Sequence, residues 1–173
     1  SETLLAQTEL GLVLRLNRER QLDLALRKVA AQYDYIVIDS PPSLGLLTIN
    51  VLLAADAVVV PSILESESVQ GVRLFLQTVT ETAQVYPEAA RVLGIALTMV
   101  DLWKEGEPRQ VAARDLLAAL RSTYGEQVFS AIVPRSAAVP ESMLLCRTLQ
   151  SYAPDNRATL AIAALTDEIV SRL

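Results

Sequence analysis

The chain has 173 residues, of which 51% are hydrophobic and 20% are charged, and its net charge is −5. This composition provides for a buried core and excludes a disordered chain, while the acidic balance argues against a strongly basic nucleic-acid-binding face. The sequence contains no histidine and a single cysteine, which excludes histidine-based metal sites, Ser-His-Asp catalysis and an internal disulfide. The cysteine count also leads us to expect a reducing, cytoplasmic compartment.

Helical and strand-like patterns alternate along the chain. The first half predicts two helices, a strand, a helix and a strand, in that order, over residues 4–15, 18–32, 35–38, 44–54 and 57–60. The second half predicts a long helix, a strand, a helix, a strand and a last helix, over residues 69–86, 93–99, 113–124, 128–133 and from about 156. Strands that are apolar on both faces and separated by helices predict a mostly parallel sheet covered by helices on both faces. We expect one α/β domain over residues 1–173.

Functional residues in such a sheet gather where the strands end. This rule nominates four short segments, at residues 39–42, 61–67, 98–101 and 134–136. In the first of them, Asp39 follows an apolar run, and Pro41 and Pro42 prevent further strand pairing because they lack an N–H donor. A carboxylate in this position can face a Mg²⁺ ion on nucleotide phosphates. Taken alone, Asp39 is explained equally well as a cap of the following turn.

A longer pattern around Asp39 is more specific. The stretch YDYIVIDSPPSLGLLTINVLLAADAVVVP, at residues 33–61, resembles the Walker B and switch II region of ParA (Soj) proteins, relatives of MinD in the deviant Walker A class. Further matches follow in the family's order, at Glu65, Gly71 and residues 93–101, 124–136 and 139–169. The resemblance covers residues 33–173 and extends more loosely to the helices before them.

The resemblance implies a P-loop NTPase fold of the SIMIBI type, incomplete at its N-terminus, that uses ATP and Mg²⁺. Asp39 matches the switch II aspartate, a catalytic residue that holds Mg²⁺ through water, and the switch loop includes Ser40, Pro41, Pro42 and Gly45. Pro134 and Ser136 match the turn that contacts adenine, and Met99 is expected to line the same pocket. Arg135 matches an arginine on the adenine side or facing DNA.

The chain departs from the family at three places. Ser136 replaces an asparagine, which shortens or removes a contact with the base. Residues 102–108 form a longer loop, whose Trp103 serves as an interface anchor or, as we favour, covers local apolar surface. Most importantly, no Gly-x-x-x-x-Gly-Lys-Ser/Thr or Lys-Gly-Gly-x-Gly-Lys-Thr sequence occurs, and all six glycines are isolated. We therefore expect the C-terminal two-thirds of a ParA-like ATPase domain, inactive by itself.

By resemblance, the parent protein is an ATPase in the partitioning of DNA, plasmids, chromosomes or other cargo. It would form an ATP-dependent homodimer, bind DNA non-specifically through Arg135, Arg147 and Arg157, associate with the nucleoid and respond to a ParB-like stimulating partner. The alternative is a non-catalytic binding or dimerisation module. No apolar run approaches the ~20 residues of a membrane-spanning helix, and no basic amphipathic helix is visible near the C-terminus, so we expect no membrane role.

Overall fold

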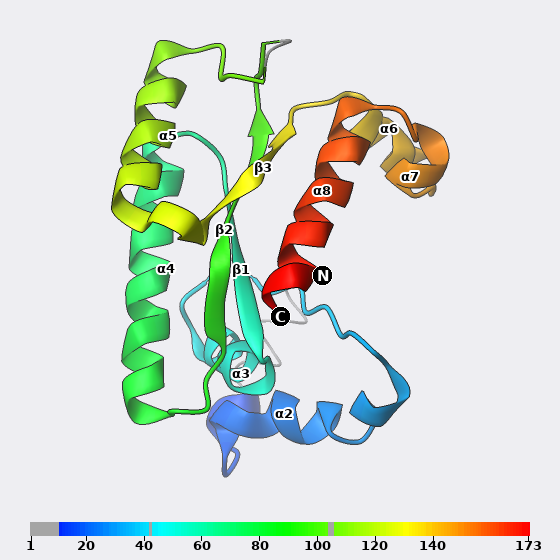
Figure 1. Ribbon diagram of the computed structural model, residues 1–173. Coiled ribbons are helices and arrows are strands. Elements are labelled where there is room, and N and C mark those ends of the chain that lie inside the picture. The colour runs from blue at the N-terminus through cyan, green and yellow to red at the C-terminus, as the bar shows by residue number, and fades with distance from the viewer. Residues whose placement is uncertain (1–10, 42, 104–105) are drawn as a thin grey trace. The chain divides into compact units, whose positions relative to one another are not determined.

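The computed structural model describes residues 11–41, 43–103 and 106–173 (Figure 1). The chain divides into two compact units. The first unit is formed by Ser1–Val58 and Leu74–Val92, and the second by Val59–Arg73 and Leu93–Leu173. The expectation of one α/β domain over residues 1–173 stays a prediction.

Three strands form a parallel sheet. Its strands are β1 (Ala57–Ser62), β2 (Arg91–Val100) and β3 (Val128–Pro134), in the order β1-β2-β3. The helices α4 (Ser66–Val85) and α5 (Val111–Tyr124) connect successive strands. This arrangement confirms the predicted α/β class and three of the predicted strands. The strand predicted over 57–60 extends through the exposed Pro61 to Ser62, which the outermost strand of the described sheet tolerates.

The first unit contains η1 (Arg18–Arg20), α2 (Gln21–Leu26), η2 (Ala30–Gln32) and α3 (Leu46–Ala54). Its core joins Leu52, Val79 and Ala90. The predicted helix over 18–32 is broken into three short pieces, none of which buries a residue. A helix gains most of its stability from packing an apolar face, and no residue of these three pieces is fully buried. Residues 4–10 of the predicted first helix lie outside the described residues.

The predicted strand over 35–38 is not formed. The segment lies outside the sheet and has no regular secondary structure, and Tyr35 and Val37 are 63% and 94% exposed. An extended segment becomes a strand only when a neighbouring strand satisfies its N–H and C=O groups. None of the described residues forms that neighbour, so the apolar run alone is insufficient.

In the second unit, α5 and α8 (Arg157–Arg172) lie on opposite sides of β3 (Figure 1). The connection from β3 to α8 contains two short helices that the sequence did not predict, α6 (Ala138–Leu144) and α7 (Leu149–Tyr152), and η3 (Gly125–Gln127) precedes β3. The buried core includes Leu120, Phe129 and the β2 residues Ile95 and Leu97. On α8, the apolar Ile162 is 42% exposed.

Two irregularities in the pairing of β2 with β3 shape the candidate site. The paired residues are Ile95 with Val128, Leu97 with Ile132 and Val100 with Pro134. β3 therefore carries extra residues in the first interval, and β2 carries one in the second. Such bulges bend a strand and redirect its side chains. The second irregularity lies at the ends of β2 and β3, beside the site described next.

Candidate functional site

The ends of β2 and β3 and the start of α8 surround a cavity of about 230 Å³. The residues that line it come from segments far apart in sequence: Asp101, Leu102, Arg109, Pro134, Arg135, Ser136, Asn156 and Arg157. Two of the four segments nominated from the sequence, 98–101 and 134–136, thus contribute to one cavity. Its volume is below the ~300–1,000 Å³ typical of pockets for whole ligands, so it suits one moiety of a larger molecule.

Met99 lies on the bulge at the end of β2. Its φ of 52° is in the left-handed region, which is uncommon for a residue other than glycine and clusters at functional sites. The side chain is 51% exposed and is not among the residues that line the cavity. The bulge thus places Met99 at the strand end, two residues before the cavity-lining Asp101, while the lining role predicted for it stays a prediction.

The turn after β3 is attached to both β2 and α8. The Arg135 N–H donates to the Val100 carbonyl at 3.0 Å. The Ser136 hydroxyl donates to Asn156 Oδ1 at 3.1 Å and accepts from the Ala138 N–H at 3.3 Å. Ser136, the residue that replaces the family's asparagine, therefore holds the turn against the start of α8.

Asn156 is a site residue that the sequence reasoning missed. Its Oδ1 accepts from the Ala158 N–H at 2.9 Å, which caps α8, as well as from Ser136. These two bonds orient the amide so that the Nδ2 hydrogens, for which no acceptor is found among the described residues, remain available at the cavity. In the sequence, an asparagine directly before a predicted helix is a signal for a helix cap. Its place in the site becomes visible only from its contact with Ser136 in the structure.

The cavity has an excess of positive charge. Arg109, Arg135 and Arg157 contribute to its lining, against the single carboxylate of Asp101. Arg135 Nε lies 3.5 Å from Asp101 Oδ1, and both side chains are about half exposed, so this ion pair contributes little to stability. A planar guanidinium both pairs with anions and stacks on aromatic rings. The lining therefore suits an aromatic or anionic group.

The loop after β2 is held together by local contacts. Leu102 and Pro108 form an antiparallel bridge. The Arg109 guanidinium lies 4.6 Å from the centre of the Trp103 ring, and Arg157 Nη2 donates to the Trp103 carbonyl at 3.0 Å. The Trp103 ring thus contacts a guanidinium and is 48% exposed, and its covering of local apolar surface stays a prediction. Residues 104 and 105 lie outside the described residues.

The predicted switch segment belongs to the first unit. Asp39 and Ser40 are exposed and Pro41 is partly buried, whereas Pro42 lies outside the described residues. Asp39 forms none of the ion pairs found among the described residues. Gly45 precedes α3 with φ −91° and ψ −166°, an extended conformation that any residue adopts.

A magnesium ion bound only by protein does not fit this segment. Within the described residues, no group of three or more Asp, Glu, His or Cys side chains could hold a metal ion. Mg²⁺ that arrives on nucleotide phosphates, however, keeps several waters and needs only one or two carboxylates. The exposed carboxylate of Asp39 fits that second arrangement.

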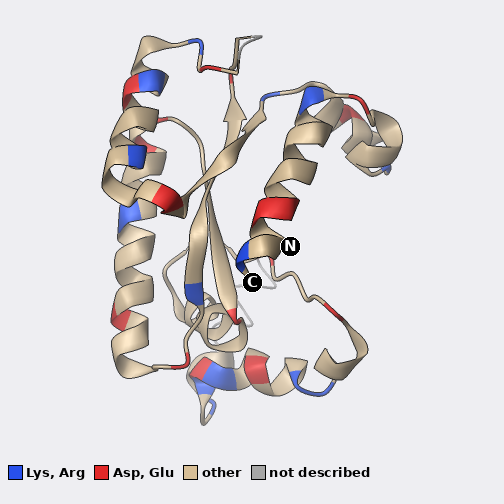
Figure 2. Ribbon diagram, in the orientation of Figure 1, with Lys and Arg blue, Asp and Glu red and all other residues tan. Residues whose placement is uncertain are grey.

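The three arginines predicted to contact DNA are not gathered on one surface strip. Arg135 and Arg157 line the cavity, whereas Arg147 lies between α6 and α7, with its guanidinium 5.8 Å from the Tyr152 ring. Figure 2 shows that α8 mixes both signs of charge, from Arg157 at its start to Glu168 and Arg172 near its end. The described part of this helix therefore carries no basic stripe.

Comparison with known proteins assigns the chain to a family. Residues 1–91 match the family model described as an AAA domain. The chain is 36% identical over 168 residues to the chromosome partitioning protein ParA of Myxococcus xanthus, and 32% identical over 167 residues to the sporulation initiation inhibitor protein Soj of Bacillus subtilis. This chain belongs to the ParA/MinD family of AAA-domain ATPases.

The ParA/MinD fold is confirmed by a solved structure. Cobyrinic acid a,c-diamide synthase from Mycobacterium smegmatis, with bound ATP analog and magnesium, superposes with a TM-score of 0.73 at 30% identity. The match covers 94% of this chain and 57% of the synthase. The resemblance and the SIMIBI-type fold predicted from the sequence are thus confirmed.

This ParA/MinD-family chain spans only part of its relatives. The match with the Myxococcus ParA includes 97% of this chain and 57% of that protein. The match with the Bacillus Soj includes 96% of this chain and 64% of that protein. The glycine-lysine phosphate loop is not among its 173 residues. No helix within the described residues is long and apolar enough to cross a membrane.

Proposed function

We propose that this chain supplies the switch aspartate and the adenine-binding turn of a ParA-type partitioning ATPase. The observation that carries the proposal is the cavity at residues 134–136, where the family's adenine-contacting turn meets the end of β2 and the start of α8. The bound ATP analog and magnesium of the Mycobacterium smegmatis structure support the choice of ligand.

Each site residue has a distinct role in this proposal. Pro134 and the backbone of Arg135 form one wall for the base, and Arg135 and Arg157 offer guanidinium planes for stacking. Asn156 Nδ2 donates to a ring nitrogen of adenine, replacing the contact that the shorter Ser136 loses. Asp39 orients a water molecule of the Mg²⁺ shell. Bound Mg²⁺ neutralises phosphate charge during transfer, and a phosphate loop outside these 173 residues completes the site.

The cellular role follows from the family. The complete protein partitions DNA or another cargo, forms a homodimer with ATP, binds DNA non-specifically through arginines that include Arg135, Arg147 and Arg157, and is reset by a ParB-like partner. Its compartment is the cytoplasm, with association with the nucleoid. The curated relatives named for chromosome partitioning support this role.

Calorimetric titration of the chain with adenosine and with Mg-ATP tests the base-binding part. Because the phosphate loop is absent from these residues, we expect both ligands to bind with similar affinity and EDTA to change neither. Asn156→Ala should weaken adenosine binding about tenfold, the equivalent of ~1.4 kcal/mol, whereas Gln150→Ala, an exposed change outside the cavity, should leave it unchanged. Absence of adenosine binding would remove the base-binding role.

A non-catalytic binding or dimerisation module is the second candidate function. A chimera distinguishes the two candidate functions. It joins this chain to the part of the Myxococcus ParA that precedes the matched region. The ATPase proposal predicts Mg²⁺-dependent hydrolysis that falls about 10–100-fold with Asp39→Ala, as for other residues that act on a metal through water. A folded chimera that binds ATP without hydrolysing it would favour the module.

A further inference from the structure

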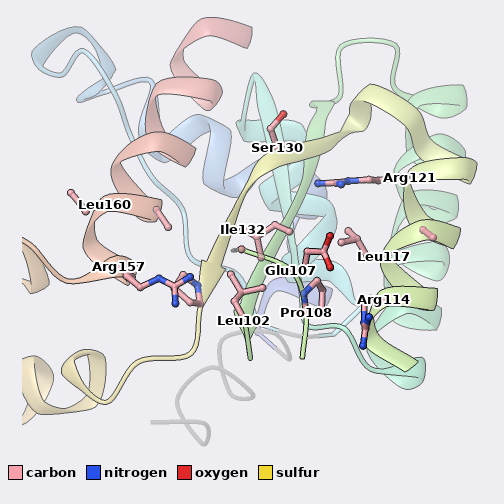
Figure 3. A pocket seen from close by; sticks show the side chains of 14 residues that line it. Leu102, Glu107, Pro108, Arg114, Leu117, Arg121, Ser130, Ile132, Arg157 and Leu160 are labelled. Carbon is pink, nitrogen blue, oxygen red and sulfur yellow. The ribbon is translucent and has the colours of Figure 1, made fainter. Parts of the chain in front are cut away.

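A groove larger than the base-binding cavity runs beside β3 in the second unit. Its volume is about 770 Å³, and it is lined by α5, β3 and α8 (Figure 3). β3 is the last strand in the order β1-β2-β3, so the groove follows the edge of the sheet. In Figure 3, Leu117 of α5 and Leu160 of α8 flank Ile132 of β3. The groove thus has an apolar floor between two helices, with the Glu107 side chain beside Ile132 in Figure 3.

The rims of the groove carry positive charge. Arg114 and Arg121 line it from α5, and Arg157 lines it from α8, while Glu107 is the only acidic residue among the lining residues. Arg114 and Arg121 are exposed and take part in none of the ion pairs found among the described residues. In a chain whose net charge is −5, this local excess of arginine favours an acidic partner.

The arginines of α5 have a helical repeat. Arg114, Leu117 and Arg121 are spaced i, i+3 and i+7, so they lie on one face of α5. Seven residues advance about 10.5 Å along a helix axis. A partner helix with acidic side chains seven residues apart, and apolar side chains between them, reproduces this spacing. Leu160, which is 58% exposed, offers apolar contact from the opposite wall.

The edge of β3 does not favour an added strand. The Ser130 and Ala131 N–H groups already donate to the two carboxylate oxygens of Glu168, at 2.9 and 2.7 Å. Pro134 has no N–H to offer. Pairing with an extended peptide would therefore find few free donors along this edge. Covering a sheet edge with a helix is a common alternative in folded proteins.

We propose that this groove binds an acidic amphipathic helix of a partner protein. The acidic side chains lie against Arg114 and Arg121, and the apolar face packs on Leu117, Ile132 and Leu160. Duplex DNA does not suit the groove, because its phosphates would contact only the arginines of the rims and would leave the apolar side chains between them uncovered. The interaction requires neither adenosine nor Mg²⁺, so its test is independent of the proposed nucleotide function.

Fluorescence anisotropy of the full chain with a labelled synthetic helix tests the proposal. The probe is an 18-residue peptide with leucines at helical i, i+3, i+4 and i+7 spacing and glutamates beside them. Two control peptides keep its length, one with the same composition scrambled and one with lysine for every glutamate. We expect the acidic helix to bind, the two controls to bind at least about tenfold more weakly, and added salt to weaken binding.

Charge-reversal variants locate the binding surface. Arg114→Glu and Arg121→Glu should each weaken binding about tenfold, the equivalent of ~1.4 kcal/mol. Arg73→Glu, a matched exposed change on α4 outside the groove, should not alter it. Circular dichroism and thermal melting check that each variant is folded. Leu160→Asp should also reduce binding, since it places a charge on the apolar wall.

Several results would overturn the proposal. Absence of binding by the amphipathic acidic peptide, equal binding of the scrambled peptide, or binding that does not change in Arg114→Glu and Arg121→Glu each contradict it. Displacement of the peptide by a 20-base-pair DNA duplex, with the same dependence on these arginines, would assign the groove to nucleic acid instead.

Discussion

Gly94 lies against Phe129 so closely that no side chain fits between them: a Cβ at Gly94 would be 2.8 Å from Phe129 Cε2 and 2.6 Å from the Gln127 carbonyl oxygen. The other side of this cluster is formed by Arg172 of α8. Its guanidinium lies 4.2 Å from the centre of the Phe129 ring, and Nη1 donates to the Leu93 carbonyl at 3.0 Å. The last turn of α8 is therefore attached to β2 and β3 through one aromatic ring and one cation.

Gly94→Ala should destabilise the protein, because the added methyl group overpacks a site that includes backbone. We expect the free energy of unfolding to fall by about 1–3 kcal/mol, measured by urea denaturation. Gly71→Ala is the matched control, since a Cβ at Gly71 on α4 meets nothing within 4 Å. That change should stabilise by roughly 0.4–1 kcal/mol. Equal effects of the two substitutions would contradict the packing argument.

Glu168→Ala should expose the bulge in β3. The carboxylate accepts from two successive N–H groups, of Ser130 and Ala131, and its loss leaves both without a partner. We expect a loss of about 1–3 kcal/mol and faster hydrogen exchange at these two amides. Asp167→Ala, the exposed neighbour, is the control. Unchanged exchange at residues 130 and 131 would show that Glu168 does not hold the bulge.

Asn50→Ala should release the short helices of the first unit from α3. The buried Asn50 amide accepts from the Leu22 N–H at 3.1 Å and donates to the Arg18 carbonyl at 2.8 Å and the Leu46 carbonyl at 2.9 Å. We expect a loss of about 1–3 kcal/mol and faster tryptic cleavage after Arg18 and Arg20. The surface change Gln84→Ala should leave cleavage unaltered. Resistance of the Asn50→Ala protein to trypsin would contradict this role.

The pKa of Tyr152 should depend on Glu141. The Tyr152 hydroxyl donates to Glu141 Oε2 at 3.0 Å, and this hydrogen bond to a carboxylate raises the pKa of Tyr152 above its ordinary value of 10.0. Since the folded-state pKa is raised, the stabilisation is present below the ordinary pKa and is lost as the pH rises through the folded value. Glu141→Gln should lower the pKa of Tyr152, followed by NMR titration of the tyrosine ring. A titration unchanged by the substitution would show that the contact is absent in solution.

The sequence by itself determined the elements whose signals are local. β1, β2 and β3 were predicted because each is a continuous apolar run, and α4 and α5 because their apolar residues repeat at helical spacing before Pro87 and Gly125. The family and its fold were also identified from the sequence, since a long ordered string such as residues 33–61 constrains identity more than any single residue. The strand predicted over 35–38 is not formed. A strand depends on pairing with a neighbouring strand, and the residues of the segment do not encode that neighbour.

Only the tertiary structure decided how the candidate site is assembled. Ser136 and Asn156 are 20 residues apart, and their hydrogen bond exists because α6 and α7 bring the chain back to the end of β3. The bulges at Met99 and Ser130 belong to the irregular pairing between β2 and β3, and the arginines of α5 and Leu160 line one groove because both helices lie beside β3. Contacts of this kind depend on how segments that are distant in sequence pack together. Apolar periodicity indicates only which residues of one segment are buried, and so it does not predict these contacts.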